Sequence, residues 1–116
     1  MELTKQVCSL ELAKRLKELR VKQQSVFAHY DGRVVAHNFE HTVREFGGAA
    51  YAAFTVAELG EMVPRKFYTR FDGQGWIGEV DGKFVLGTAS DTEADARAKM
   101  LIYLLEHHIL PDMLSL

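Results

Sequence analysis

The chain has 116 residues, of which 47% are hydrophobic and 26% are charged, the ordinary balance of a globular protein. Its net charge of -2 disfavours a broad phosphate-binding surface, which is usually basic. The single cysteine, Cys8, excludes an internal disulfide and a cysteine-rich zinc site. No apolar run approaches the roughly 18 residues that cross a bilayer, and the N-terminus lacks the apolar core of a signal peptide. We therefore expect one domain over residues 1–116, in a reducing, cytoplasmic setting.

The first predicted element is a helix from Ser9 to about Val21. Ser9 is a suitable N-cap because its hydroxyl can accept a hydrogen bond from the first turn. Apolar residues then recur at helical spacing, at Leu12, Ala13, Leu16 and Leu19.

A β-hairpin is predicted next. Asp31-Gly32 separates two apolar alternating runs, Ser25–Tyr30 and Val34–Phe39. The dipeptide favours a type I′ turn, whose two central residues both need positive φ. From Glu40 to Tyr51 the pattern fades. Gly47-Gly48 indicates a break, and the alanines around it are equally compatible with a helix and a loop.

Two capping boxes organise the second half of the chain. Thr55-Val-Ala-Glu58 opens a short helix to about Met62, which Pro64 stops. Ser90-Asp-Thr-Glu93 is a second box, and it predicts a helix over Asp91–His108. Between them, Gly-rich turns join three short strands, Phe67–Phe71, Trp76–Val80 and Lys83–Gly87.

This order of elements predicts an α+β fold. We expect an N-terminal helix, a hairpin, a short helix, a three-stranded antiparallel meander and a long C-terminal helix packed on one sheet face. We also expect the strands to join in one sheet. On the last helix, Asp95, Lys99 and Glu106 form a narrow polar stripe within a largely apolar circumference. Such a helix either lies centrally in the core or forms an interface, for example in a homodimer.

The chain carries no recognisable catalytic motif, so we expect no catalytic, cofactor-binding or metal-binding residues and favour a protein that is not an enzyme. His37 and His41 have i, i+4 spacing, but the glutamate between them is misplaced for a His-Glu-x-x-His zinc motif. His29 would at most pair with His37 across the hairpin. Cys8 is typical of a small buried apolar residue rather than a nucleophile.

Aromatic and arginine residues on the meander form the first candidate interaction site. Strand alternation separates Phe67 and Phe71 from Tyr68 and Arg70, so one set packs on the helix and the other faces outward. We expect Trp76 to accompany Tyr68 and Arg70 on the open face. Aromatic and arginine side chains are favourable anchors for a protein or a stacked base, although cross-strand packing also explains them.

Arg97 is the second candidate, because it lies within the apolar arc of the last helix. A buried guanidinium needs a carboxylate partner, and Glu58 or Glu61 could supply one. The alternatives are that its head reaches the solvent at the edge of the helix, or that it grips a ligand.

Two resemblances add expectations. The α-β-β-β-α order of residues 55–108, with the stretch Gly87–Leu101, is similar to double-stranded-RNA-binding domains. The acidic residues Asp91, Glu93 and Asp95 stand where that family has a basic cluster, so only the topology is implied. The segments Val7–Leu19, Phe54–Met62 and Thr92–Leu105 look like those of small, uncharacterised proteins of bacteria, phages and prophages. That resemblance implies a mobile-element setting in a bacterial host cell.

Our preferred interpretation is a non-enzymatic phage or prophage accessory protein that acts by protein–protein contact, in a specific version by inhibiting a host defence factor. An acidic inhibitor can occupy a nucleic-acid-binding surface by charge complementarity. One alternative is a small-molecule or nucleotide binder, or an enzyme, with a pocket between sheet and helix that uses Arg97 and a histidine. The other, which the charge disfavours, is a nucleic-acid-binding module using Arg65, Lys66, Arg70 and the aromatic face of the meander.

Overall fold

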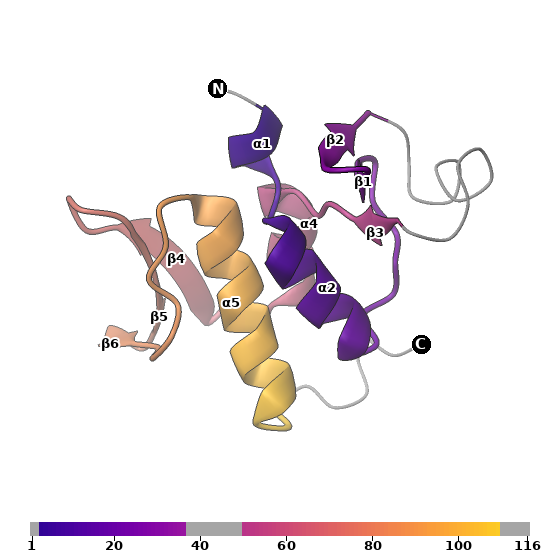
Figure 1. Cartoon of the computed structure of the whole chain (residues 1–116). Helices are drawn as coiled ribbons and strands as arrows, with labels where there is room; N and C mark the ends of the chain where they lie inside the picture. The colour runs from indigo at the N-terminus through magenta and orange to yellow at the C-terminus, as the bar shows by residue number, and fades with distance from the viewer. Residues whose placement is uncertain (1–2, 37–49, 110–116) are drawn as a thin grey trace.

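Two helices open the fold in the computed structural model, which describes residues 3–36 and 50–109 (Figure 1). They are α1 (Leu3–Gln6), which the sequence did not predict, and α2 (Leu10–Glu18). Ser9 is the N-cap of α2, as predicted, and its Oγ accepts the Leu12 N–H at 3.4 Å. The helix ends before Val21 because the backbone turns at Arg20, which has a φ of 69°.

The predicted hairpin is confirmed in its described part. Strands β1 (Ala28–Tyr30) and β2 (Arg33–Val35) pair antiparallel around Asp31 and Gly32, whose φ values are 52° and 73°. Positive φ at both positions is what the type I′ turn requires. A third strand, β3 (Tyr51–Ala52), pairs with β1 and was not predicted.

Parts of the sequence prediction fall outside the described residues. They are the end of the second hairpin strand from residue 37 to 39, the Gly47-Gly48 break, and both His37 and His41.

The first capping box is confirmed. The Thr55 Oγ1 accepts the Glu58 N–H at 3.1 Å, and the Glu58 carboxylate accepts the Thr55 N–H at 2.9 Å. Together they start helix α4 (Val56–Met62), and the chain is already extended at Val63, ahead of Pro64.

The meander forms a second sheet in the order β4-β5-β6, which consists of β4 (Phe67–Phe71), β5 (Trp76–Val80) and β6 (Lys83–Phe84). The expectation of one sheet was therefore wrong: Figure 1 shows β1–β3 and β4–β6 on opposite sides of the helices, which occupy the space between them.

The last predicted strand is shorter than expected. It leaves the ladder after Phe84, and Thr88 fills the gap: its Oγ1 accepts the Gly78 N–H at 2.9 Å and donates to the Val85 carbonyl at 2.7 Å. Pairing then resumes in a bridge between Trp76 and Ser90.

The sequence predicted Ser90 as the N-cap of the last helix, two residues before the observed N-cap, Thr92. Helix α5 (Glu93–Glu106) begins after Thr92, whose Oγ1 accepts the Asp95 N–H at 3.2 Å. Ser90 is not the cap, because its backbone is committed to the bridge with Trp76 through hydrogen bonds of 2.7 and 2.9 Å.

Helix α5 lies at the centre of the fold (Figure 1). It packs against α1, α2, α4, β4 and β5, and its buried residues lie all around its axis. They are Ala94, Ala96, Ala98, Met100, Leu101, Ile102 and Leu104. Of the two alternatives for this helix, the central one is therefore confirmed. Met100 and Leu104 are covered within one chain, which leaves them unavailable as a dimer surface.

Candidate interaction surface

The meander turns one face toward α5 and the other away from it. Residues directly opposite each other in an antiparallel pair point to the same side of the sheet. Thr69 is opposite Gly78, and both contact α5: Thr69 accepts a hydrogen bond from Arg97, and the Met100 sulfur lies 3.0 Å from the position that a Cβ at Gly78 would take. The residues immediately before and after Thr69 on β4, and before and after Gly78 on β5, therefore point away from the helix.

That outward side of the sheet is called the open face below. Its five residues are Tyr68, Arg70, Ile77, Glu79 and Phe84. Register places Tyr68 opposite Glu79 on β5, and Glu79 in turn opposite Phe84 on β6, so the three side chains form a row across the sheet. Arg70 is opposite Ile77 in the neighbouring row.

Two of the predicted residues, Tyr68 and Arg70, share the open face as strand alternation indicated. Trp76 does not join them. It is directly opposite Phe71, and the two rings meet edge to face with centroids 5.7 Å apart. Since Phe71 is on the same side of β4 as Thr69, the aromatic pair belongs to the end of the helix-facing side.

An ionised cluster lies at the centre of the open face. The Arg70 Nε lies 3.0 Å from a carboxylate oxygen of Glu79, whose side chain is only 9% exposed. The hydroxyl of Tyr68 also hydrogen-bonds to Glu79. The bond from Arg70, followed by that from Tyr68, lowers the pKa of Glu79. The same contact to Glu79 raises the pKa of Tyr68. Glu79 is a functional candidate that the sequence analysis missed.

Exposed apolar side chains gather on this meander. On the open face, Tyr68 is 41% exposed and Phe84 is 47% exposed, while Phe71 at the end of the helix-facing side and Leu86 beyond β6 are 56% and 75% exposed. These are four of the six large apolar residues that are exposed in the described part of the chain. Such residues are normally scattered singly over a surface, so this gathering marks the meander as unusual.

Arg97 lies away from the open face and joins three elements. Its Nε donates to the Thr69 hydroxyl of β4 at 3.1 Å, and its Nη1 donates to the Val56 carbonyl of α4 at 3.2 Å. Its Nη2 forms an ion pair with Glu93 at 3.1 Å on α5 itself. An ion pair was correctly expected, but the partner was not, since the guanidinium meets Glu93 rather than Glu58 or Glu61.

Glu58 is unavailable to Arg97 because its carboxylate holds another segment. Beyond its capping bond, it accepts the Ser25 hydroxyl at 2.7 Å and the Val26 N–H at 3.2 Å. The residue thus ties the chain before β1 to the start of α4. With every guanidinium nitrogen of Arg97 donating to a protein acceptor, the geometry favours a structural role for that residue over ligand binding.

The thiol and the described hairpin histidine are also explained by packing. Cys8 is fully buried, and burial raises the pKa of its thiol to about 12, far from that of a reactive thiolate. The Nε2 of His29 lies 2.7 Å from the Cys8 carbonyl, and burial lowers the pKa of the imidazole. Over residues 3–36 and 50–109, no group of three or more His, Cys, Asp or Glu side chains is placed to hold a metal ion.

None of the helices in the described ranges has the length and apolar character that crossing a membrane would need. Comparisons with protein-family models, with curated proteins and with solved structures found no match to the chain.

Proposed function

We propose that this protein acts by binding another protein through the open face of the β4-β5-β6 sheet. The observation that supports the proposal is the exposure of two aromatic residues, Tyr68 and Phe84, on one face of this small sheet, on either side of Glu79. Exposed aromatic side chains, accompanied by an arginine, are typical of protein-binding surfaces. Tyr68 and Phe84 are the anchors, because aromatic residues near the centre of an interface contribute most to affinity.

The cluster on Glu79 supports a protein partner over a nucleic acid. A phosphate-binding surface needs arginines whose charge is free to meet phosphate oxygens. Arg70 is already paired with Glu79 in the middle of the open face, so its charge is not free to meet a phosphate backbone. In a protein interface, the same pair can fix the orientation of a partner's polar groups.

The biological setting in the proposal comes from the sequence resemblance alone. It is a phage or prophage accessory protein in the cytoplasm of a bacterial host, and its specific version inhibits a host defence factor. The version in which an acidic surface imitates nucleic acid does not use the open face, where Arg70 and Glu79 neutralise each other.

Site-specific photo-crosslinking tests the proposal. A photoreactive benzoylphenylalanine replaces Phe84 in one variant and exposed Lys22 in a control variant, and both are irradiated in bacterial cells. We expect a discrete crosslinked protein from position 84 that is absent from position 22. Once that protein is identified by mass spectrometry and purified, Phe84→Ser should weaken its binding at least about tenfold.

A matched apolar residue controls for surface changes in general. Val26 is 57% exposed and lies outside the meander, so Val26→Ser should leave the affinity unchanged. Three results would contradict the proposal: no crosslinked protein from position 84, a product that is only a second copy of this chain, or equal binding by the wild type and Phe84→Ser.

A further inference from the structure

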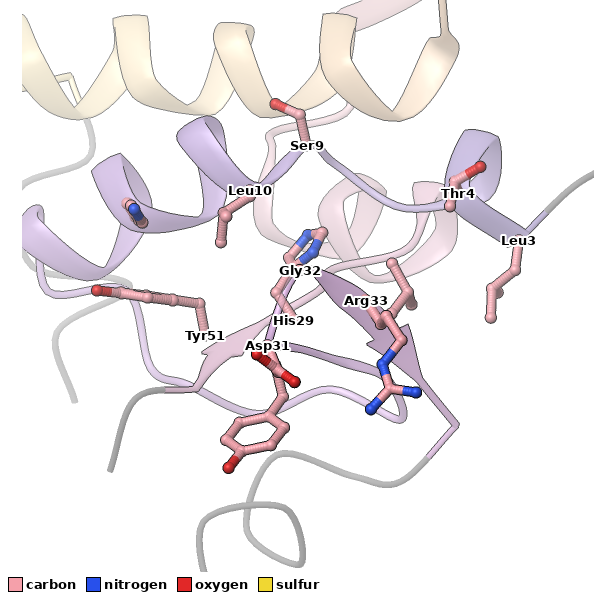
Figure 2. Close-up of a pocket in the computed structure, with 12 residues that line it drawn as sticks. Leu3, Thr4, Ser9, Leu10, His29, Asp31, Gly32, Arg33 and Tyr51 are labelled. Atoms are coloured by element: carbon pink, nitrogen blue, oxygen red, sulfur yellow. The ribbon is translucent and has the colours of Figure 1, made fainter. Parts of the chain in front are cut away.

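A pocket among the described residues lies on the other side of the molecule from the open face. It has a volume of about 890 Å³ and is bounded by α1, the first turns of α2, the β1–β2 hairpin and β3. Figure 2 shows Leu10 and Tyr51 on one side of it and Arg33 on the other. Its volume is within the range of roughly 300 to 1,000 Å³ that is usual for small-molecule sites.

Hydrogen bonds to the rest of the fold fix the segments that line this pocket. The Ser9 N–H at the start of α2 donates to the Asp95 carboxylate of α5 at 2.7 Å. The His29 ring, which lines the pocket, is held against the Cys8 carbonyl at 2.7 Å. A hydrogen bond of 2.9 Å from the Cys8 N–H to the Phe54 carbonyl further joins the linker before α2 to the chain after β3. A pocket between elements fixed in this way is formed before a ligand arrives.

The polar groups at its mouth are free to meet a ligand. The structure gives Arg33 and Asp31 no side-chain hydrogen bond or ion pair within the described residues, and Lys14 contacts only the face of the Tyr51 ring, 5.7 Å from its centroid. Among the described lining residues, two cations stand against one carboxylate, which makes this part of the lining net positive. Apolar walls with a few charged groups at the rim suit a ligand that has an apolar body and an acidic end.

We propose that this pocket binds a small organic anion with a flat, apolar body, such as an aromatic carboxylate. The carboxylate pairs with Arg33, whose planar guanidinium can donate two parallel hydrogen bonds to it. The ring system packs against Leu10 and Tyr51, on the other side of the pocket from Arg33. The site does not depend on the open face, and it differs from the pocket expected beside Arg97, where the cavity has a volume of only about 80 Å³.

Binding of naphthoate, compared with its neutral analogue naphthamide, tests the charge and the apolar body separately. We expect isothermal titration of the full chain to give a Kd below about 1 mM for naphthoate and at least about tenfold weaker binding of naphthamide. Arg33→Gln should abolish that difference. Arg65→Gln, which removes an exposed arginine of the other sheet region, should preserve it.

Two further variants sharpen the test. Asp31→Asn removes the only carboxylate among the described residues of the lining and should strengthen naphthoate binding; asparagine tolerates the positive φ at this position, so the turn is retained. Leu10→Trp fills the pocket and should abolish binding of both compounds, with the melting temperature confirming the fold. The proposal fails if neither compound binds the wild-type chain, if both bind equally, or if naphthoate binds Leu10→Trp as it binds the wild type.

Discussion

A Cβ atom at position 60 would overlap the Nη1 atom of Arg97, so the glycine in α4 makes room for a guanidinium that comes from α5. That nitrogen donates to the Val56 carbonyl one turn earlier in α4. A glycine within a helix costs up to about 1 kcal/mol relative to alanine. Gly60 and Arg97 therefore form one unit, in which the loss of helix propensity is offset by hydrogen bonds between the elements.

The first prediction follows from that unit. Gly60→Ala should lower the free energy of unfolding by about 1 kcal/mol, because displacing the guanidinium costs more than the alanine gains. In an Arg97→Ala background the same substitution should be stabilising, since the obstacle is gone. Urea unfolding of the four proteins in this double-mutant cycle measures the coupling. Additive effects of the two substitutions would contradict the relationship.

The second prediction compares two glutamates of α4. Glu58→Ala should cost about 2 kcal/mol, because the helix loses its capping box and the segment at Ser25 and Val26 loses its carboxylate acceptor. Glu61 is exposed on the same helix, so Glu61→Ala should change the stability by less than about 0.5 kcal/mol. Chemical denaturation of both variants tests this, and equal losses would count against the role of Glu58.

The third prediction concerns pH. Burial holds the pKa of His29 in the folded chain below its ordinary value of about 6.5, which the residue keeps in the unfolded chain. At a pH between the folded and the unfolded pKa, the unfolded chain therefore binds the proton more readily. The free energy of unfolding should therefore decrease as the pH falls from about 7 to 5, with a contribution from this residue of at most about 1.4 kcal/mol per pH unit.

The variant His29→Gln isolates that contribution. Its amide can still donate to the Cys8 carbonyl but does not titrate, so its stability should depend less on pH over this range than that of the wild type. Unfolding curves at several pH values compare the two proteins. Parallel pH dependences would show that His29 is not held neutral by burial.

The fourth prediction tests the cluster on the open face. Because the bond to Glu79 raises the pKa of Tyr68, Glu79→Gln should lower that pKa toward the ordinary value of about 10. Nuclear magnetic resonance of the tyrosine rings follows the titration, with Tyr68→Phe assigning the signal. Asp81→Asn, which removes a nearby exposed carboxylate, should leave the pKa of Tyr68 where it is in the wild type.

Local signals predicted the elements whose causes lie within a few residues. Asp31-Gly32 contains its own turn, and Thr55 and Glu58 satisfy each other's backbone N–H groups, so neither needs the rest of the chain. The capping box predicted at Ser90 does not form, because the backbone of Ser90 pairs instead with Trp76 of β5. Propensity alone does not indicate which of two hydroxyls, at Ser90 or at Thr92, is left for the helix.

The long-range partners were not predictable for the same reason. Strand β3 has only two residues, and what makes it a strand is its pairing with β1 across the intervening chain. Arg97 finds a carboxylate four residues away on its own helix, while Glu58 is occupied by Ser25. The pairing of β3 and the contact of Glu58 with Ser25 depend on how the elements pack, which the helical spacing of apolar residues does not specify, whereas the i, i+4 spacing of Glu93 and Arg97 was a local signal that the prediction missed.

The candidate site was partly predictable. Alternation along β4 placed Tyr68 and Arg70 together. Trp76 was misplaced, although a signal was present: Phe71 and Trp76 flank the four-residue turn and must therefore face each other. Counting outward from that turn would also have paired Tyr68 with Glu79. The pocket at Arg33 left no such signal, because α1, α2 and the hairpin meet there only in the folded chain.

The hydrogen bond between the Ser9 N–H and the Asp95 carboxylate joins residues that are 86 positions apart, and the helix that carries Asp95 fills the middle of the core. During synthesis, a nascent chain that ends at Thr92 therefore already contains the elements that α5 covers, but α5 itself has not yet been made. Phe54 and the apolar side of α2 remain open to chaperones and proteases over that interval. We expect protease resistance to appear late and in one step, only once the residues through Leu104 are free to fold.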